Sequence, residues 1–268
     1  MRTIVHLDMD TFFVSVECLK NSSLLGLPIA VGGHSDRAVV STCSYEARKF
    51  GVHSGMAMKL ARRLCPQMQI INGDMESYSK YSRLVTEIIA SKVKMNKKSS
   101  IDEFYIDMSG MDKYFGCKQY VSELKQTVIK ESGLPISYGL SINKMVSKVA
   151  TGQGKPNGAF IVDVGNEKNF LAPLPVQKIP MVGSQTTKLL NTMGVYTIKL
   201  LSEIPEQYLI NLLGKSGREL HKRSNGIDET PITPYHEQKS ISTEDTFEKD
   251  TIDIEYMHSV LARMADKV

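Results

Sequence analysis

The sequence predicts an α/β protein, because strand-like segments alternate with segments of helical periodicity over residues 1–164 and only short helical segments follow. The strand-like segments are short, apolar and mostly rich in β-branched residues, whereas the helical ones repeat apolar residues about every three or four positions. The chain has 268 residues, of which 41% are hydrophobic, so it can bury a sizeable core and is not of the disordered class. More than one domain is therefore expected.

The elements of the first part follow from these patterns. Strands are predicted at residues 3–8, 28–31, 38–42, around 101, 104–108, 136–142 and 159–162, and helices at 12–19, 45–50, 56–64, 77–93, 118–131 and 144–150. Gly51 and Pro66 end the second and third of these helices. Four lysines at the end of helix 77–93 are expected to form a solvated helix end, where cations suit the helix dipole: Lys92, Lys94, Lys97 and Lys98.

Past residue 166 the expected elements are short helices, including one at 185–193 that follows Pro180-Met181-Val182-Gly183. A polar linker at 228–239 contains Pro231 and Pro234. A strand at 240–247 and a helix at 253–267 are predicted after it.

Charge and cysteine content give weaker indications. The net charge of +4 permits a polyanionic partner without requiring one. The four cysteines include no C-x-x-C pair, which favours a reduced, cytoplasmic compartment. The chain begins directly with a strand-like run and has no apolar stretch long enough to span a bilayer, so neither a signal peptide nor a membrane association is expected.

Two acidic clusters carry most of the chemical information: V-H-L-D-M-D at residues 5–10 and S-S-I-D-E-F-Y-I-D at 99–107. Asp8, Asp102 and Glu103 are distant in sequence, and carboxylates repel one another unless positive charge lies between them. Hard divalent cations prefer oxygen ligands, and two of them about 4 Å apart serve in-line phosphoryl transfer. Either cluster alone is more simply a solvated strand end, but together they favour a two-metal site.

Three further motifs fit phosphate chemistry. The segment S-T-C-S-Y-E-A-R-K-F-G at 41–51 places Tyr45 and Arg48 on one helix face, where they can grip a triphosphate. The alternative for Arg48 is a surface ion pair with Glu46 or Asp74. The turn K-P-N-G at 155–158 presents an ammonium, although most such lysines are simply exposed. Residues 180–188 resemble a helix-hairpin-helix, whose backbone amides hold nucleic-acid phosphate without reading bases.

Taken in order, L-D-M-D-T-F-F-V-S-V-E, S-T-C-S-Y-E-A-R-K-F-G-V, S-I-D-E-F-Y-I-D and G-K-P-N-G resemble the motifs of the Y-family, or lesion-bypass, DNA polymerases, nearest to the DNA polymerase IV branch. The resemblance extends over essentially the whole chain. It implies a right-hand polymerase with an α+β palm at residues 1–11 and 74–165, inserted fingers at 12–73 and a helical thumb with the hairpin at 166–230. A linker at 231–240 and the start of a truncated little finger at 241–268 would follow.

The resemblance also implies roles for individual residues. The catalytic carboxylates would be Asp8, Asp102 and Glu103, which with Met9 would hold two Mg²⁺ ions, for which Mn²⁺ can substitute. The nucleotide would contact Phe12, Phe13, Thr42, Tyr45, Arg48 and Lys155, with Phe13 as the steric gate under the sugar. Ser41, Gly55 and Met56 would lie near the nascent base pair, and Gly183, Ser184 and Lys188 would bind DNA.

The implied function is a template-directed translesion DNA polymerase that adds deoxynucleotides to a primer 3′-hydroxyl. Primer-template DNA and deoxynucleoside triphosphates are the expected partners, with a sliding clamp reached through the missing C-terminal region, and a monomer is expected. The alternatives are a non-catalytic DNA-binding scaffold of the same fold and a palm-type nucleotidyl cyclase. One departure is Met181, which stands where the family hairpin usually has Gly.

Overall fold

Five strands in the order β5-β6-β1-β7-β8 form the larger sheet of this protein, described by a computed structural model over residues 2–93, 96–111, 116–233 and 239–268. The strands are β1 Ile4–Met9, β5 Asn96–Lys98, β6 Glu103–Asp107, β7 Ile136–Ser141 and β8 Ala159–Ile161. β1 is central and pairs antiparallel with both β6 and β7, while β8 runs parallel to β7. Both ends of β1 are therefore fixed by two neighbours.

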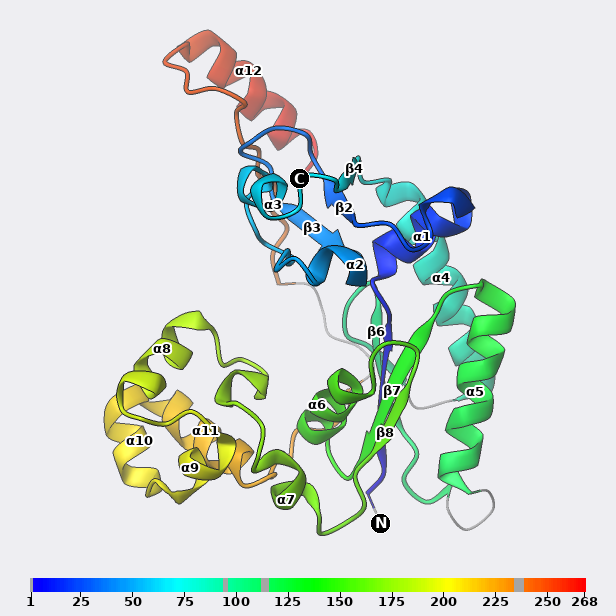
Figure 1. The fold of residues 1–268 in the computed structure, drawn as a ribbon, viewed down its shortest axis with the longest axis vertical. Helices are drawn as coiled ribbons and strands as arrows, with labels where there is room; N and C mark the ends of the chain where they lie inside the picture. Colours follow the sequence, from blue (N-terminus) through cyan, green and yellow to red (C-terminus); the bar gives the residue numbers. More distant parts are fainter. Residues whose placement is uncertain (1, 94–95, 112–115, 234–238) are drawn as a thin grey trace. The chain divides into compact units, whose positions relative to one another are not determined.

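Helices cover both faces of this sheet (Figure 1). On one face lie α4 (Met75–Lys92) and α5 (Cys117–Ser132), joined where Tyr120 Oη donates to Lys92 O at 2.7 Å. On the other face α6 (Lys144–Gly154) approaches β7 so closely that a Cβ on Gly139 would lie 2.1 Å from Ser147 O. Glycine is therefore required at position 139, and α6 is held directly against the middle of the sheet.

Short helices follow the sheet: α7 Glu167–Leu171, η3 Val176–Lys178, α8 Ser184–Thr192, α9 Ile198–Glu203, α10 Glu206–Leu213 and α11 Lys215–Ser224. Their buried residues form one apolar cluster with α6, which includes Val149, Leu171, Leu190, Leu201 and Leu220. Burial of this cluster joins the helical segment to the sheet-bearing part of the chain.

Met181 adopts a left-handed backbone conformation in the turn before α8. Its φ is +74° and its side chain is 88% exposed, a combination that Gly tolerates at much lower cost than an L-residue. Arg223 donates to the carbonyl of the preceding residue, Pro180, at 2.9 Å and so helps to hold the turn. The backbone thus takes the conformation that a glycine would adopt, although the residue is Met.

The chain divides into two compact units, Met1–Ser15 with Glu76–Pro234, and Val16–Met75 with Tyr235–Val268. In the second unit, β2 (Ile29–Gly32) lies between β3 (Val40–Cys43) and β4 (Gln69–Ile71). Its helices are η1 Ser22–Leu24, α2 Tyr45–Arg48, α3 Met58–Leu64 and α12 Ile254–Ala265, while α1 (Phe12–Lys20) runs across the division. The assignment of palm, fingers, thumb and little finger to these parts of the chain stays a prediction.

Most predicted elements are confirmed, and three details are wrong. The partner of β6 is β5, not a strand at Ile101, so Lys97 and Lys98 lie in a strand and not at a helix end. Lys98 Nζ donates to Ser82 Oγ at 2.6 Å and lies 5.9 Å from the ring centre of Phe104, contacts that suit a lysine on an edge strand. β4 was not predicted, and residues 240–247 form no strand. Of the predicted linker at 231–240, residues 234–238 lie outside the described residues.

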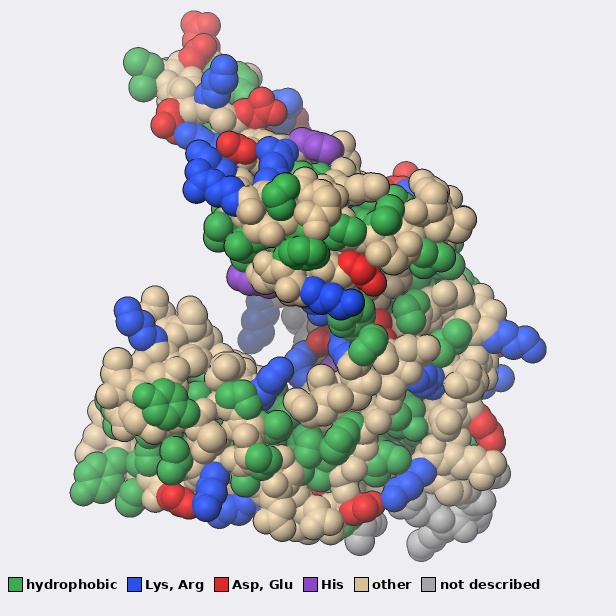
Figure 2. Space-filling model, in the orientation of Figure 1, with side chains coloured by type: hydrophobic (Ala, Val, Ile, Leu, Met, Phe, Trp, Pro, Cys, Tyr) green, Lys and Arg blue, Asp and Glu red, His purple; other side chains and the backbone are tan. Residues whose placement is uncertain are grey.

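The surface agrees with the mild net charge. On the face drawn in Figure 2, Lys and Arg side chains are interspersed with Asp and Glu. None of the helices in the described ranges combines the length and apolar character needed to cross a bilayer.

Candidate active site

Two carboxylates face each other at one end of the larger sheet. The register of β1 and β6 places Asp8 directly opposite Glu103, and the next amide, that of Met9, donates to Asp102 O at 3.1 Å. Both carboxylates are largely buried, the Asp8 side chain being 14% exposed. Like charges directly opposite on neighbouring strands are destabilising, so the site requires positive charge nearby.

Two lysines supply this charge. Lys155 Nζ donates to Asp8 Oδ1, and Lys148 Nζ of α6 lies 2.5 Å from both oxygens of Glu103. Burial raises the pKa of Asp8 to about 6, although Lys155 opposes the shift. Burial acts in the same direction on Glu103, but His6 and Lys148 beside it lower its pKa to about 2. The two carboxylates are therefore unequal, and the one on β1 is the less well compensated.

His6 lies behind this pair on β1. Its Nδ1 is 2.8 Å from Thr151 Oγ1 on α6, and its Nε2 is 3.7 Å from Glu103 Oε2. The ring is buried, and burial is the largest cause of its lowered pKa. Glu103 beside the ring opposes this lowering of the His6 pKa.

The donor set suits a hard divalent cation, because all of its donors are oxygens. Of the three candidate carboxylate ligands, Asp102 is engaged elsewhere, because its Oδ1 accepts a hydrogen bond from Ser100 Oγ at 2.6 Å. No three His, Cys, Asp or Glu side chains within the described residues converge as a metal site would require. Rotation of Asp102 away from Ser100 would complete the set with Asp8 and Glu103. The residues thus fit a divalent ion, and lysine ammoniums lie against two of its candidate ligands.

Phe12 and Phe13 follow β1 and differ in environment. Phe12 is buried in the core. Phe13 is half-buried, and its ring stacks on that of Tyr78 with centroids 4.2 Å apart and planes at 11°. A firmly stacked, partly accessible ring has the rigidity that a steric gate needs.

The predicted nucleotide residues of the other unit lie together there. Thr42 lies on β3, opposite Val31. Arg48 Cζ lies 5.0 Å from the centre of the Tyr45 ring, a cation–π arrangement on one face of α2. Asp74, considered above as an ion-pair partner for Arg48, instead accepts from Lys20 at 2.8 Å. The basic and phenolic groups are thus neighbours within their own unit.

The residues predicted near the nascent base pair also lie in the second unit. Ser41 is exposed, Gly55 has φ +81° at a turn, and Met56 is buried in that unit's apolar cluster. Only the first two are therefore open to a ligand.

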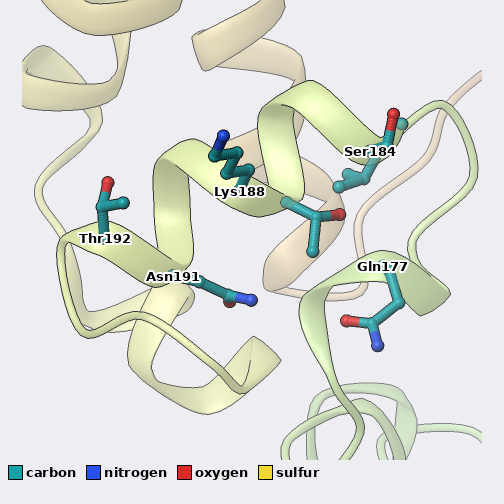
Figure 3. Close-up of a pocket in the computed structure, with 8 residues that line it drawn as sticks. Gln177, Ser184, Lys188, Asn191 and Thr192 are labelled. Carbon is teal, nitrogen blue, oxygen red and sulfur yellow. The ribbon is translucent and has the colours of Figure 1, made fainter.

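The predicted DNA residues line a groove of about 560 Å³ beside α8 (Figure 3). Gly183, Ser184 and Lys188 contribute to its wall, and the amides that open α8 have no side-chain cap. In Figure 3 the Asn191 side chain points from α8 toward the side on which Gln177 lies. Asn191 Oδ1 is buried and lacks a hydrogen-bond partner within the described ranges. Uncapped amides at a helix N-terminus suit phosphate oxygens.

Sequence reasoning missed the two residues that contact Glu103, namely Lys148 and His6. His6 could have been found, because residues two apart on a strand share a face and His6 precedes Asp8 by two. Lys148 carried no such signal, since its proximity depends on how α6 packs against the sheet.

Comparison with known proteins gives a consistent result. Residues 7–152 match the impB/mucB/samB family. The chain is 38% identical over 270 residues to DNA polymerase IV of Shewanella frigidimarina, over 100% of this chain and 75% of the relative. An insertion ternary complex of the Dbh DNA polymerase has a TM-score of 0.77 at 25% identity, over 86% of this chain and 69% of that one. A Y-family DNA polymerase chimera has a TM-score of 0.86 at 24% identity, over 99% and 79%.

The lysine at Asp8 yields a stability prediction. Replacing Lys155 with Met should lower the free energy of unfolding in metal-free buffer by about 1–3 kcal/mol, because it leaves a buried carboxylate unpaired. Chemical denaturation measures the change. Lys118→Met is the matched control, since Lys118 pairs with Asp163 at 2.8 Å in solvent and should cost less than about 0.5 kcal/mol. Equal effects of the two substitutions would contradict the assigned role of Lys155.

Proposed function

The chain belongs to the impB/mucB/samB family and is a Y-family DNA polymerase of the translesion type, and we propose that Asp8, Asp102 and Glu103 are its catalytic carboxylates. The observation that carries the proposal is the pair Asp8 and Glu103, directly opposed on neighbouring strands beside lysine ammoniums. A polymerase of this family depends on divalent metal, and we propose two Mg²⁺ ions held by these carboxylates and the Met9 carbonyl, with Mn²⁺ able to substitute.

The reaction adds a deoxynucleotide, selected by the template, to a primer 3′-hydroxyl. When bound, the divalent ions would lower the pKa of that hydroxyl and neutralise charge on the triphosphate. Lys155 would leave Asp8 and contact the triphosphate, because its ammonium prefers the more highly charged partner. Phe12 and Phe13 would offer the first amides of α1 to phosphate oxygens, and the Phe13 ring would lie beneath the sugar.

The second unit would complete the nucleotide site. Tyr45 and Arg48 already share one face of α2, so a single approach of that helix can bring the phenol and the guanidinium to the same phosphate group. Thr42 on the neighbouring strand would add a hydroxyl. Ser41 and Gly55 would leave room beside the nascent pair for a distorted template.

Primer-template DNA is the macromolecular substrate, and we propose that the groove beside α8 binds its backbone. Gly183 and Ser184 would contribute backbone amides and Lys188 a charge. Contacts of this kind are independent of sequence, as a polymerase requires. A monomer in the cytoplasm, with a sliding clamp as a further partner, stays a prediction.

Removing charge from the carboxylate site should abolish chemistry and spare DNA binding. Glu103→Gln and Asp102→Asn should each lower turnover at least about 100-fold, the usual cost of losing one preorganised electrostatic group at a reaction centre. Primer extension with Mg²⁺ measures turnover, and fluorescence anisotropy measures DNA binding. Asp107→Asn, at the opposite end of β6, is the control and should extend primers normally. Extension by Glu103→Gln at the wild-type rate would refute the assignment.

Phe13 should determine the choice of sugar. Replacing it with Ala removes the ring beneath the sugar, so ribonucleotides should no longer clash and the ratio of deoxy- to ribonucleotide incorporation should fall. The matched control is Phe160→Ala, which removes another partly exposed ring and should leave the ratio unchanged. The Phe160 ring packs against that of Phe170, with centroids 5.0 Å apart and planes tilted by 39°. If Phe13→Ala also leaves the ratio unchanged, Phe13 only packs against Tyr78.

A further inference from the structure

Asp10 is the most deeply buried carboxylate at this end of the sheet, and the chemistry described above does not use it. It directly follows β1, and its side chain is 1% exposed, whereas the Asp8 side chain is 14% exposed. Its amide donates to Pro135 O at 2.9 Å, and its carbonyl accepts from Ser15 Oγ at 2.6 Å. The residue is thus fixed on both sides of its side chain. A carboxylate buried this far must find donors inside the protein.

The donors are a backbone amide of the turn that carries Lys155 and a hydroxyl of β7. Asn157 N–H donates to Asp10 Oδ2 at 2.5 Å. Ser137 Oγ donates to the same carboxylate, at 2.8 Å from Oδ2 and 3.0 Å from Oδ1, and accepts from Gly158 N–H at 3.2 Å. Asp10 therefore holds two consecutive amides of the turn, one directly and one through a hydroxyl. Both of its carboxylate oxygens accept hydrogen bonds.

The carbonyls of the same turn are held by a buried lysine. Lys125 Nζ on α5 lies 2.6 Å from Asn157 O and 3.3 Å from Gly158 O. Asn157 has φ +45°, and a Cβ on Gly158 would lie 2.0 Å from Gly154 O, so the turn accepts few other residues. A negative group thus fixes the N–H groups and a positive group fixes the C=O groups, and the backbone is left with little freedom.

Lys155 begins this turn, and its ammonium depends on the same carboxylate. Lys155 Nζ lies 3.7 Å from Asp10 Oδ1 while it donates to Asp8. When the ammonium moves to a triphosphate, the contact with Asp8 is lost, but the backbone clamp is not. The position of the lysine stem is therefore set by Asp10 through Asn157 and Ser137.

We propose that Asp10 is a positioning residue for the incoming nucleotide, which acts by clamping the Lys155–Gly158 turn through Asn157 N–H and Ser137 Oγ. This inference rests on the proposed contact between Lys155 and the triphosphate. Asp10 itself touches neither metal nor substrate. Its loss should weaken nucleotide binding, because Lys155 would then have to be ordered at the expense of binding energy.

Steady-state single-nucleotide insertion by Asp10→Asn tests the proposal. The KM for the deoxynucleotide should rise by about tenfold, within the value of a hydrogen bond to a charged group, while kcat stays within about threefold of wild type. Ser137→Ala is a milder second variant and should shift KM in the same direction. Glu167→Gln is the control, since Glu167 is also a buried carboxylate that accepts a backbone N–H, that of Gly165, and it should leave KM unchanged.

A double-mutant cycle with Lys155→Ala separates positioning from general damage. Once the lysine is gone, Asp10→Asn should change KM by less than about twofold, because there is no ammonium left to position. Three results would each overturn the proposal. They are an equal rise of KM in both backgrounds, a loss of kcat at constant KM, and an unchanged KM in both Asp10→Asn and Ser137→Ala. Failure of the wild-type chain to insert nucleotides would instead overturn the proposed function.

Discussion

The repulsion between Asp8 and Glu103 is the constraint around which this end of the molecule is organised. Their opposition follows from the register of β1 and β6, two strands that are buried almost throughout. A shift by one residue would move every side chain of β1 to the opposite face of the sheet, against different helices, so the two charges cannot be separated by sliding the strands. The repulsion is balanced by nearby cations, namely Lys148 beside Glu103 and Lys155 beside Asp8.

Each of these lysines depends on a different part of the fold. Lys148 reaches Glu103 because Gly139 lets α6 lie directly against β7. Lys155 reaches Asp8 from a turn whose amides and carbonyls are held by Asp10 and Lys125. The acidic pair therefore depends on both α6 and the turn at Lys155. A bound divalent ion would balance the carboxylates in place of the lysines, and a triphosphate would bind Lys155.

The acidic residues of the candidate site could be recognised in the sequence, while much of the organisation around them could not. We could pick out Asp8, Asp102 and Glu103 because acidic residues beside apolar strands are recognisable from the neighbouring sequence alone. Lys148 and Ser137 are ordinary residues until tertiary packing brings them to Glu103 and Asp10. The wrong partner for β6 has the same cause, because the pairing of β6 with β5 is a tertiary contact that leaves no local signal in the sequence. Met181 shows the reverse case, a residue whose type argues against the backbone conformation that it adopts.

We propose that the opposed carboxylates are a divalent-cation site, whose negative charge the lysines balance when no cation is bound. Electron paramagnetic resonance of Mn²⁺, with neither DNA nor nucleotide present, measures this directly from the loss of the free-ion signal. The wild-type chain should take up Mn²⁺, and the double variant Asp8→Asn with Glu103→Gln should not, while the far-ultraviolet circular dichroism of the variant is unchanged. Equal Mn²⁺ uptake by the folded double variant and the wild-type chain would contradict it.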